Sequence, residues 1–234
     1  MLILLTFIIG TYLGSFGLWL CQQWINNEPG SWTRRSRCET CQHILKAKDL
    51  IPIISFIFYK RRCAYCKTPL PFSYLWSELS AGILAVLWLF VPYGYKISYG
   101  VLFFILFLMS WCDILEGWVP DRLQWGLFIS CLWCFYPILS KDWMPWLYGI
   151  LLFTSLSLIL LLRPHWIGGA DIKLFTILTL TLPIQWVPWL LFIPSISALI
   201  VIVGLYVWTH KWIPSIRFVP FIAISYLLLL TFAH

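Results

Sequence analysis

Long apolar segments separated by short polar stretches determine what this chain can fold into. The sequence is 61% hydrophobic and only 11% charged over its 234 residues, whereas about 25% of the residues in soluble globular domains are charged. A transmembrane α-helix needs roughly 20 apolar residues, and backbone groups inside hydrocarbon must be satisfied internally. The composition therefore excludes an ordinary soluble enzyme and predicts an all-α polytopic membrane protein.

The apolar segments predict about eight transmembrane helices. The first lacks a basic start and a small-residue cleavage site, so we expect a retained span and not a removed signal peptide. Pro183, Pro188 and Pro194 interrupt the sixth and seventh segments, whose boundaries are the least defined. The predicted spans are residues 2–24, 76–92, 97–112, 123–139, 144–162, 172–183, 186–208 and 216–233.

Basic residues predict the orientation of these spans. Of the 16 Lys and Arg residues, only Lys96 and Lys141 fall on one side of an eight-span arrangement. Because basic loops mark the cytoplasmic face, the opposite side is predicted to be cytoplasmic and both termini to lie outside. The organisation is then a first helix (1–24), a cytoplasmic segment (25–75) and a transmembrane domain (76–234). The basic residues of that segment favour contact with membrane lipid over nucleic acid, because no nucleic-acid-binding pattern accompanies them.

Two Cys-x-x-Cys pairs in the cytoplasmic segment predict a metal site. Cys38 and Cys41 are separated from Cys63 and Cys66 by 21 intervening residues, slightly beyond the usual spacing of zinc ribbons. Four thiolates suit tetrahedral Zn²⁺, and a reducing cytoplasm favours metal binding over disulfides. A zinc-ribbon-like segment of this size would obtain its folding energy from the metal, so we expect structural zinc.

Two aspartates at the ends of apolar segments predict the chemistry. Asp113 follows the run Val101–Cys112, and Asp171 follows Gly168-Gly169-Ala170 just before another apolar run. Acids at a membrane edge are expensive and mark functional sites. Two carboxyls that share one site cannot both ionise easily, so one acts as an acid and the other as a base. This pair predicts an aspartyl protease with Asp113 and Asp171 as catalytic residues.

Together these motifs resemble those of the prepilin peptidases (type IV leader peptidases), which are bacterial membrane aspartyl proteases. The resemblance runs in order through most of the chain. Its landmarks are Gly14-Ser15-Phe16, the two cysteine pairs, Tyr74 and Glu78, Asp113 with Pro120-Asp121, Asp171 with Lys173-Leu174, and Arg217-Phe218-Val219-Pro220-Phe221 in place of the family's Pro-Phe-Gly-Pro-Phe. Ala170 stands where the family has a glycine. Alanine would be strained if this position needs a positive φ, and tolerated if the position needs only a close approach of the backbone to its neighbours.

The resemblance implies a substrate and a location. It implies cleavage of prepilin or pseudopilin precursors at the cytoplasmic side of the bacterial cytoplasmic membrane. Many family members also N-methylate the new terminus with S-adenosylmethionine, and that cofactor is expected here only if this activity is present. Glu78 could cap a helix or contribute to methyl transfer. Lys173 could lower the pKa of Asp171 or anchor its helix at the membrane interface. Asp121 could cap the next helix or take part directly in catalysis.

Two other function classes remain open at the level of sequence. A membrane thiol oxidoreductase would use Cys38 and Cys41 as a redox pair. A proton-coupled transporter would also carry acids, but nearer the middle of broken spans. Cys131 and Cys134 share one face of a predicted span and are interpreted as packing residues.

The orientation gives a first testable prediction. Single cysteines introduced into residues 30–70 of a background without reactive thiols should react only with reagents that reach the cytoplasm. A tag after His234 should be accessible from outside. A cytoplasmic tag would remove one span from the count and separate the two aspartates across the membrane.

Overall fold

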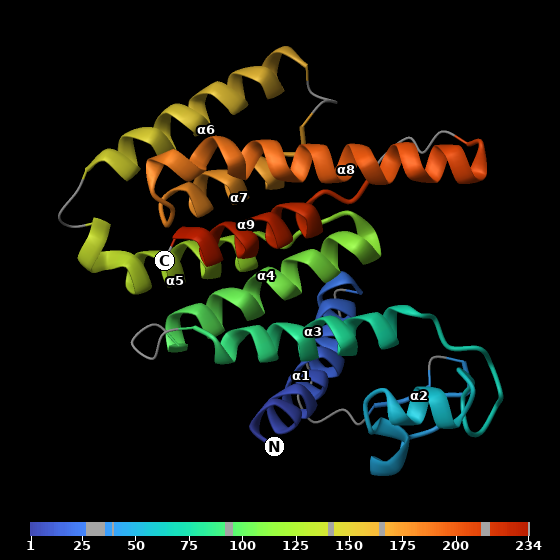
Figure 1. The fold of residues 1–234 in the computed structure, drawn as a ribbon. Helices are drawn as coiled ribbons and strands as arrows, with labels where there is room; N and C mark the ends of the chain where they lie inside the picture. The colour runs from blue at the N-terminus through green and yellow to red at the C-terminus, as the bar shows by residue number, and fades with distance from the viewer. Residues whose placement is uncertain are drawn as a thin grey trace. The chain divides into compact units, whose positions relative to one another are not determined.

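The structure is a computed structural model that describes residues 1–26, 36–38, 40–91, 96–139, 143–163, 167–211 and 216–233. Within these residues the secondary structure is helical, apart from two isolated β-bridges. The chain divides into two compact units, Met1–Gly100 and Val101–His234 (Figure 1). The prediction of an all-helical fold is confirmed for this part of the chain.

The first unit is organised around a pair of packed helices, α1 (Leu2–Ile25) and α3 (Ser73–Leu89). The segment between them carries a short 3₁₀ helix η1 (Ala47–Leu50) and the short helix α2 (Ile54–Phe58). The interface of α1 and α3 is built on glycines, as in membrane helix pairs that approach closely. A Cβ at Gly14 would lie 2.5 Å from the Ser77 carbonyl oxygen, so the two backbones nearly touch.

The second unit places one short helix among longer ones. Its helices are α4 (Lys96–Glu116, from Val101 onward), α5 (Asp121–Leu139), α6 (Met144–Leu162), α7 (Gly169–Thr179), η3 (Ile184–Trp186), α8 (Val187–Thr209) and α9 (Val219–Ala233). Helix α7 packs against α5, α6, α8 and α9 (Figure 1), and six of its 11 residues are buried. The short helix therefore forms part of the core of this unit.

Each predicted span contains a helix, but the helices differ in their ability to cross a bilayer. Within the described residues, α1, α4, α6 and the stretch Ile184–Thr209 are long and apolar enough to span. Ser73–Leu89 and Val219–Leu230 are shorter apolar helices. With 11 residues, α7 is about 16 Å long, well short of the roughly 30 Å hydrocarbon core. The count of eight spans stays a prediction.

The close approach of α1 and α3 gives a second prediction. Gly14→Ala should destabilise the protein by about 1–3 kcal/mol, because the new methyl group forces two backbones apart. Thermal unfolding in detergent measures this effect. The matched control is Gly204→Ala on α8, where a Cβ meets nothing within 4 Å. Equal melting temperatures for the two variants would contradict the assignment of a tight glycine interface.

Candidate active site and metal centre

The two Cys-x-x-Cys pairs form equivalent turns in the first unit. In one, the N–H of Cys38 donates to the His43 carbonyl over 3.1 Å, and in the other the N–H of Cys63 donates to the Thr68 carbonyl over 2.9 Å. Each turn has a residue with positive φ directly after its second cysteine, Gln42 at 55° and Lys67 at 62°. Each turn is also closed by one antiparallel bridge. The repeated geometry directs both cysteines of each pair toward the other pair.

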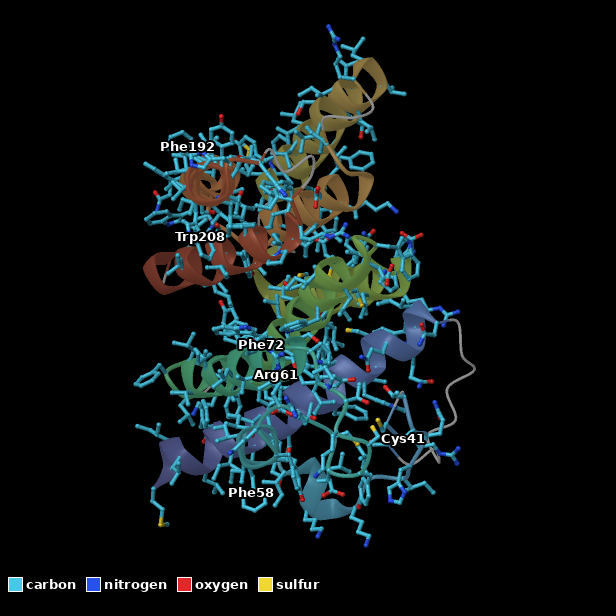
Figure 2. All side chains as sticks on the ribbon, turned by 90° about the vertical axis from the view of Figure 1, so that its right-hand side faces the viewer. Cys41, Phe58, Arg61, Phe72, Phe192 and Trp208 are labelled. Carbon is cyan, nitrogen blue, oxygen red and sulfur yellow. The ribbon has the colours of Figure 1, made fainter. Side chains whose placement is uncertain are left out.

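The four sulfur atoms have the spacing of a tetrahedral thiolate site. They all lie within 4.8 Å of one another, and Cys38 Sγ lies 3.8 Å from Cys66 Sγ. Zn–S bonds of about 2.3 Å give sulfur–sulfur edges of roughly 3.8 Å in a regular tetrahedron. Cys41 lies at the exposed side of this cluster (Figure 2). Cys38, Cys41, Cys63 and Cys66 could therefore hold a zinc ion with all four positions filled by protein.

Local hydrogen bonds favour the thiolate form at one of these cysteines. The Thr68 hydroxyl lies 3.1 Å from Cys66 Sγ. Hydrogen bonds from the side chain and backbone of Thr68 lower the pKa of the Cys66 thiol to about 6. The thiolate is the form that ligates metal. Cys41 differs from Cys66, because desolvation and the neighbouring thiols outweigh a hydrogen bond from the His43 backbone and raise its pKa to about 11.

Asp49 organises the rest of the cysteine segment. Its carboxylate accepts hydrogen bonds from the Lys46 N–H and from the hydroxyls of Tyr59 and Tyr65, at 2.9–3.0 Å. Desolvation raises its pKa, but these three donors outweigh it and hold the pKa of Asp49 below its usual range. The ring of Tyr65 in turn packs against that of His43, with 3.7 Å between centroids and the ring planes tilted by 34°. One acid thus connects both cysteine turns with η1.

Glu78 joins this segment to the helix pair of the first unit. Its carboxylate is buried on α3 and accepts the Ile53 N–H over 2.7 Å and a hydrogen bond from the Ser15 side chain of α1. Ile53 has a φ of 61°, which is uncommon for a β-branched residue. Nearby, the guanidinium of Arg61 lies over the Phe72 ring, 4.5 Å from its centroid (Figure 2). Glu78 therefore does not cap its own helix. Its hydrogen bonds connect the cysteine segment with α1 and α3.

In the second unit, Asp113 lies buried near the end of α4 and faces the start of α9. Its Oδ2 accepts the N–H of Val219 over 3.1 Å, and the N–H of Phe218 also donates to the carboxylate. The first N–H groups of a helix are unsatisfied within the helix and carry partial positive charge. The α9 N-terminus therefore supplies the donors that a buried carboxylate requires.

A glycine and an arginine complete the surroundings of Asp113. Gly117 ends α4 with a φ of 72°, and its N–H donates to the Asp113 carbonyl over 2.7 Å, the usual left-handed ending of a helix. A Cβ at Gly117 would overlap the guanidinium of Arg217. The positive charge of Arg217 acts on the Asp113 carboxylate. Only glycine permits both the turn and this close approach.

Asp171 occupies the third position of α7, whose N-cap is Gly168. Its carboxylate accepts a hydrogen bond from the backbone of Gly168, the reciprocal half of a capping box. A Cβ at Gly168 would lie 2.9 Å from Asp171 Oδ2, so this glycine permits the approach. Ala170 lies inside α7 and is not among the residues with positive φ, so alanine is not strained there.

The two predicted catalytic acids come within electrostatic reach of each other. The charge of Asp113 on α4 acts on Asp171 on α7. Lys173 pairs instead with Asp121 at the start of α5, with 2.8 Å between Nζ and Oδ1. Both of those side chains are exposed, at 50% and 72%. The two candidate acids are called the dyad below, and their pairing stays a prediction. Asp121 and Lys173 form an ion pair with each other instead.

The other cysteines lie outside these sites. Cys21, Cys112 and Cys131 are fully buried in helices, which for Cys131 agrees with its interpretation as a packing residue. The side chain of Cys134 lies outside the described residues, as do Arg34, Arg35 and His165. Sequence reasoning missed the contacts of Arg217 with Gly117 and of Asp49 with two tyrosines.

Comparison with known proteins identifies the family. Residues 8–91 match the model of the bacterial peptidase A24 N-terminal domain, and residues 100–203 match that of the type IV leader peptidase family. The chain belongs to the type IV leader peptidase family, and its apolar helices are those of an integral membrane protein.

Curated relatives carry one common name. The chain is 31% identical over 198 residues to a "prepilin leader peptidase/N-methyltransferase" of Burkholderia pseudomallei (strain 1026b), covering 81% of this chain and 64% of that protein. Proteins with the same name from Vibrio cholerae (27% over 178 residues; 72% and 70% covered) and Bacillus subtilis (28% over 162 residues; 64% and 62% covered) are also similar. The matched part thus spans less than two thirds of the Burkholderia protein. No solved structure matches the chain.

The cysteine cluster gives a third prediction. The protein purified under reducing conditions should contain one zinc ion per chain, and Cys38→Ser with Cys63→Ser should release it and make residues 36–70 sensitive to protease. Metal analysis and limited proteolysis measure the two effects. Cys112→Ser, in a buried helix outside the cluster, is the control and should retain the metal. Absence of zinc from the reduced wild-type protein would contradict the assignment.

Proposed function

We propose that this chain is an aspartic endopeptidase that removes the leader from prepilin or pseudopilin precursors. The observation that carries the proposal is that the charge of Asp113 acts on Asp171, although the two acids are 58 positions apart in the sequence. Membership of the family and the names of its relatives support the same reaction.

The surroundings of the two acids suggest how the dyad divides the work. Burial of Asp113 disfavours its carboxylate form, but two backbone N–H groups and the positive charge of Arg217 oppose that effect. The negative charge of Asp113 acts on Asp171 and favours the protonated form of its carboxyl group. Asp113 would therefore deprotonate the attacking water, and Asp171 would hold the proton that polarises the scissile carbonyl. As the tetrahedral intermediate collapses, Asp113 gives the proton it took from water to the leaving amine, and the re-formed carbonyl returns its proton to the dyad.

The proposal includes a location. We place the protein in the bacterial cytoplasmic membrane with eight spans and with the dyad at the cytoplasmic face, as the distribution of basic residues favours. The organisation is a first span (1–24), a cysteine segment (25–75) and a peptidase domain (76–234). Zinc would stabilise the cysteine segment as a closed structural site.

N-methylation of the new terminus is a further proposed activity. It rests on the names of the relatives, which include N-methyltransferase. S-adenosylmethionine would supply the methyl group. The described residues show no feature that assigns its binding site, and the proposal for the peptidase does not depend on it.

The dyad gives a fourth prediction. Asp113→Asn and Asp171→Asn should each lower cleavage of a precursor by at least about 10²–10⁴-fold, because each removes one proton-transferring group. Incubation of membranes with a precursor, read by mass spectrometry, reports the cleavage site and any added methyl group. Asp121→Asn is the matched control and should keep much of the activity, since Asp121 is exposed and pairs with Lys173. Activity in Asp113→Asn with none in Asp121→Asn would show that the first acid is wrongly assigned.

A further inference from the structure

The short helix α2 of the cysteine segment turns one apolar face outward. Ile54, Ile57 and Phe58 have the spacing of residues on one side of a helix and are 62%, 66% and 76% exposed. On the opposite side, Phe56 is buried, and its ring centroid lies 6.0 Å from that of Phe72. A contiguous exposed apolar face outside a membrane span marks a site of interaction. Ile54, Ile57 and Phe58, hereafter the apolar face of α2, therefore indicate a binding surface.

Hydrogen bonds place the start of α2 at the depth of the membrane. Glu78 on α3 accepts the N–H of Ile53, the residue directly before α2, and a hydrogen bond from Ser15 of α1. Helix α1 is long and apolar enough to span a bilayer. Ser15 lies ten residues before its end at Ile25, which is about 15 Å along the helix axis. The 24 residues of α1 extend over about 36 Å, only about 6 Å more than the hydrocarbon core. Ser15, Glu78 and the start of α2 therefore lie at the level of lipid.

Basic residues follow the apolar face directly. Lys60 and Arg61 have φ angles of 51° and 59°, so the chain turns back sharply after α2. The guanidinium of Arg61 lies over the Phe72 ring, 4.5 Å from its centroid (Figure 2), and Lys60 and Arg62 are exposed. Such side chains extend along apolar surface and keep their charges at the level of the headgroups, where anionic lipid attracts them. An apolar face bordered by cations is complementary to an anionic bilayer.

Depth and charge together decide between the possible occupants of this surface. A water-soluble partner cannot reach a face that lies at the level of lipid. A second copy of the chain is disfavoured by charge, because each copy carries a net charge of +7 and would bring like charges together. Anionic lipid supplies both hydrocarbon for the apolar side chains and phosphate for the cations. The bilayer therefore fits both parts of the surface.

We propose that α2 is a membrane anchor, whose apolar face inserts into the bilayer while the basic residues 60–62 contact anionic headgroups. The lipid is that of the leaflet in which α1 ends and α3 begins. The anchor gives the cysteine segment a direct attachment to the membrane in addition to α1 and α3. This inference does not depend on the proposed peptidase function, and its tests do not require cleavage of a precursor.

Cleavage by trypsin gives the fifth prediction. Trypsin cuts after Lys60, Arg61 and Arg62, and insertion of α2 should shield these bonds. With the full chain in nanodiscs that contain anionic lipid, the double variant Ile57→Ser and Phe58→Ser should be cut there at least about tenfold faster than wild type, because two apolar side chains lose their burial in lipid. In purely zwitterionic lipid, wild type should be cut at least about fivefold faster, the value of one basic residue at an anionic surface.

A matched variant and a stability measurement control this experiment. Ile44, beside the first cysteine turn, is also an exposed apolar residue, and Ile44→Ser should leave the cleavage rate unchanged. All these variants should melt in detergent at the wild-type temperature, because the replaced side chains are exposed. Equal cleavage of wild type and the double variant, or a fall in melting temperature that accounts for faster cleavage, overturns the anchor.

Photo-crosslinking identifies the occupant directly. In vesicles of the same anionic lipid mixture, Phe58→p-benzoylphenylalanine should form adducts with lipid, and Ile44→p-benzoylphenylalanine should form at least about fivefold fewer. Phe58 lies apart from Cys41, which is three residues before Ile44 (Figure 2), so the two probes sample different parts of the segment. Adducts of the Phe58 probe with a second copy of the chain in place of lipid, or equal lipid adducts at both positions, overturn the proposal.

Discussion

The hydrogen bond from the Val219 N–H to the buried Asp113 carboxylate is the contact on which the second unit depends. It joins positions 106 residues apart. A hydrogen bond to a charged group contributes about 1.5–3 kcal/mol, and removing the donor would leave a buried charge unpaired. The bond therefore holds the end of α4 against the start of α9. Because α7 packs on α9, this contact also supports the helix that carries the second acid.

Much of the fold could be predicted because apolar runs alone locate helices in a membrane protein. The predicted span 144–162 coincides with α6 (Met144–Leu162). The predicted span 172–183 differs from the observed helix at both ends, because α7 begins at Gly169 and ends at Thr179. Hydropathy misses such a start because Gly168 and Asp171 define it by hydrogen bonding, and it misses the end because the turn at Leu180–Leu182 is as apolar as the helix before it.

The surroundings of the site could not be predicted to the same extent. The residue types of Asp113, Asp171 and the four cysteines carry their chemistry in the sequence, so they were recognised as candidates. The N–H of Val219 carries no such signature, because every residue except proline has one. The contact of Arg217 with Gly117 links positions 100 residues apart. The resemblance to the family does not predict these two contacts, because Arg217 and Val219 stand where the family motif has proline and glycine.

The run Gly168, Gly169 and Ala170 shows why a departure from the family motif at position 170 is compatible with the fold. Gly168 cannot gain a side chain without pressing on the Asp171 carboxylate, because its Cβ would lie 2.9 Å from Oδ2. Gly169 has open space around it, so a side chain there would meet no neighbour within 4 Å. Ala170 is an ordinary helical residue, and one methyl group there neither strains the backbone nor displaces the acid. The essential glycine is therefore the one that donates to Asp171, and the substitution at position 170 is compatible with a dyad that works.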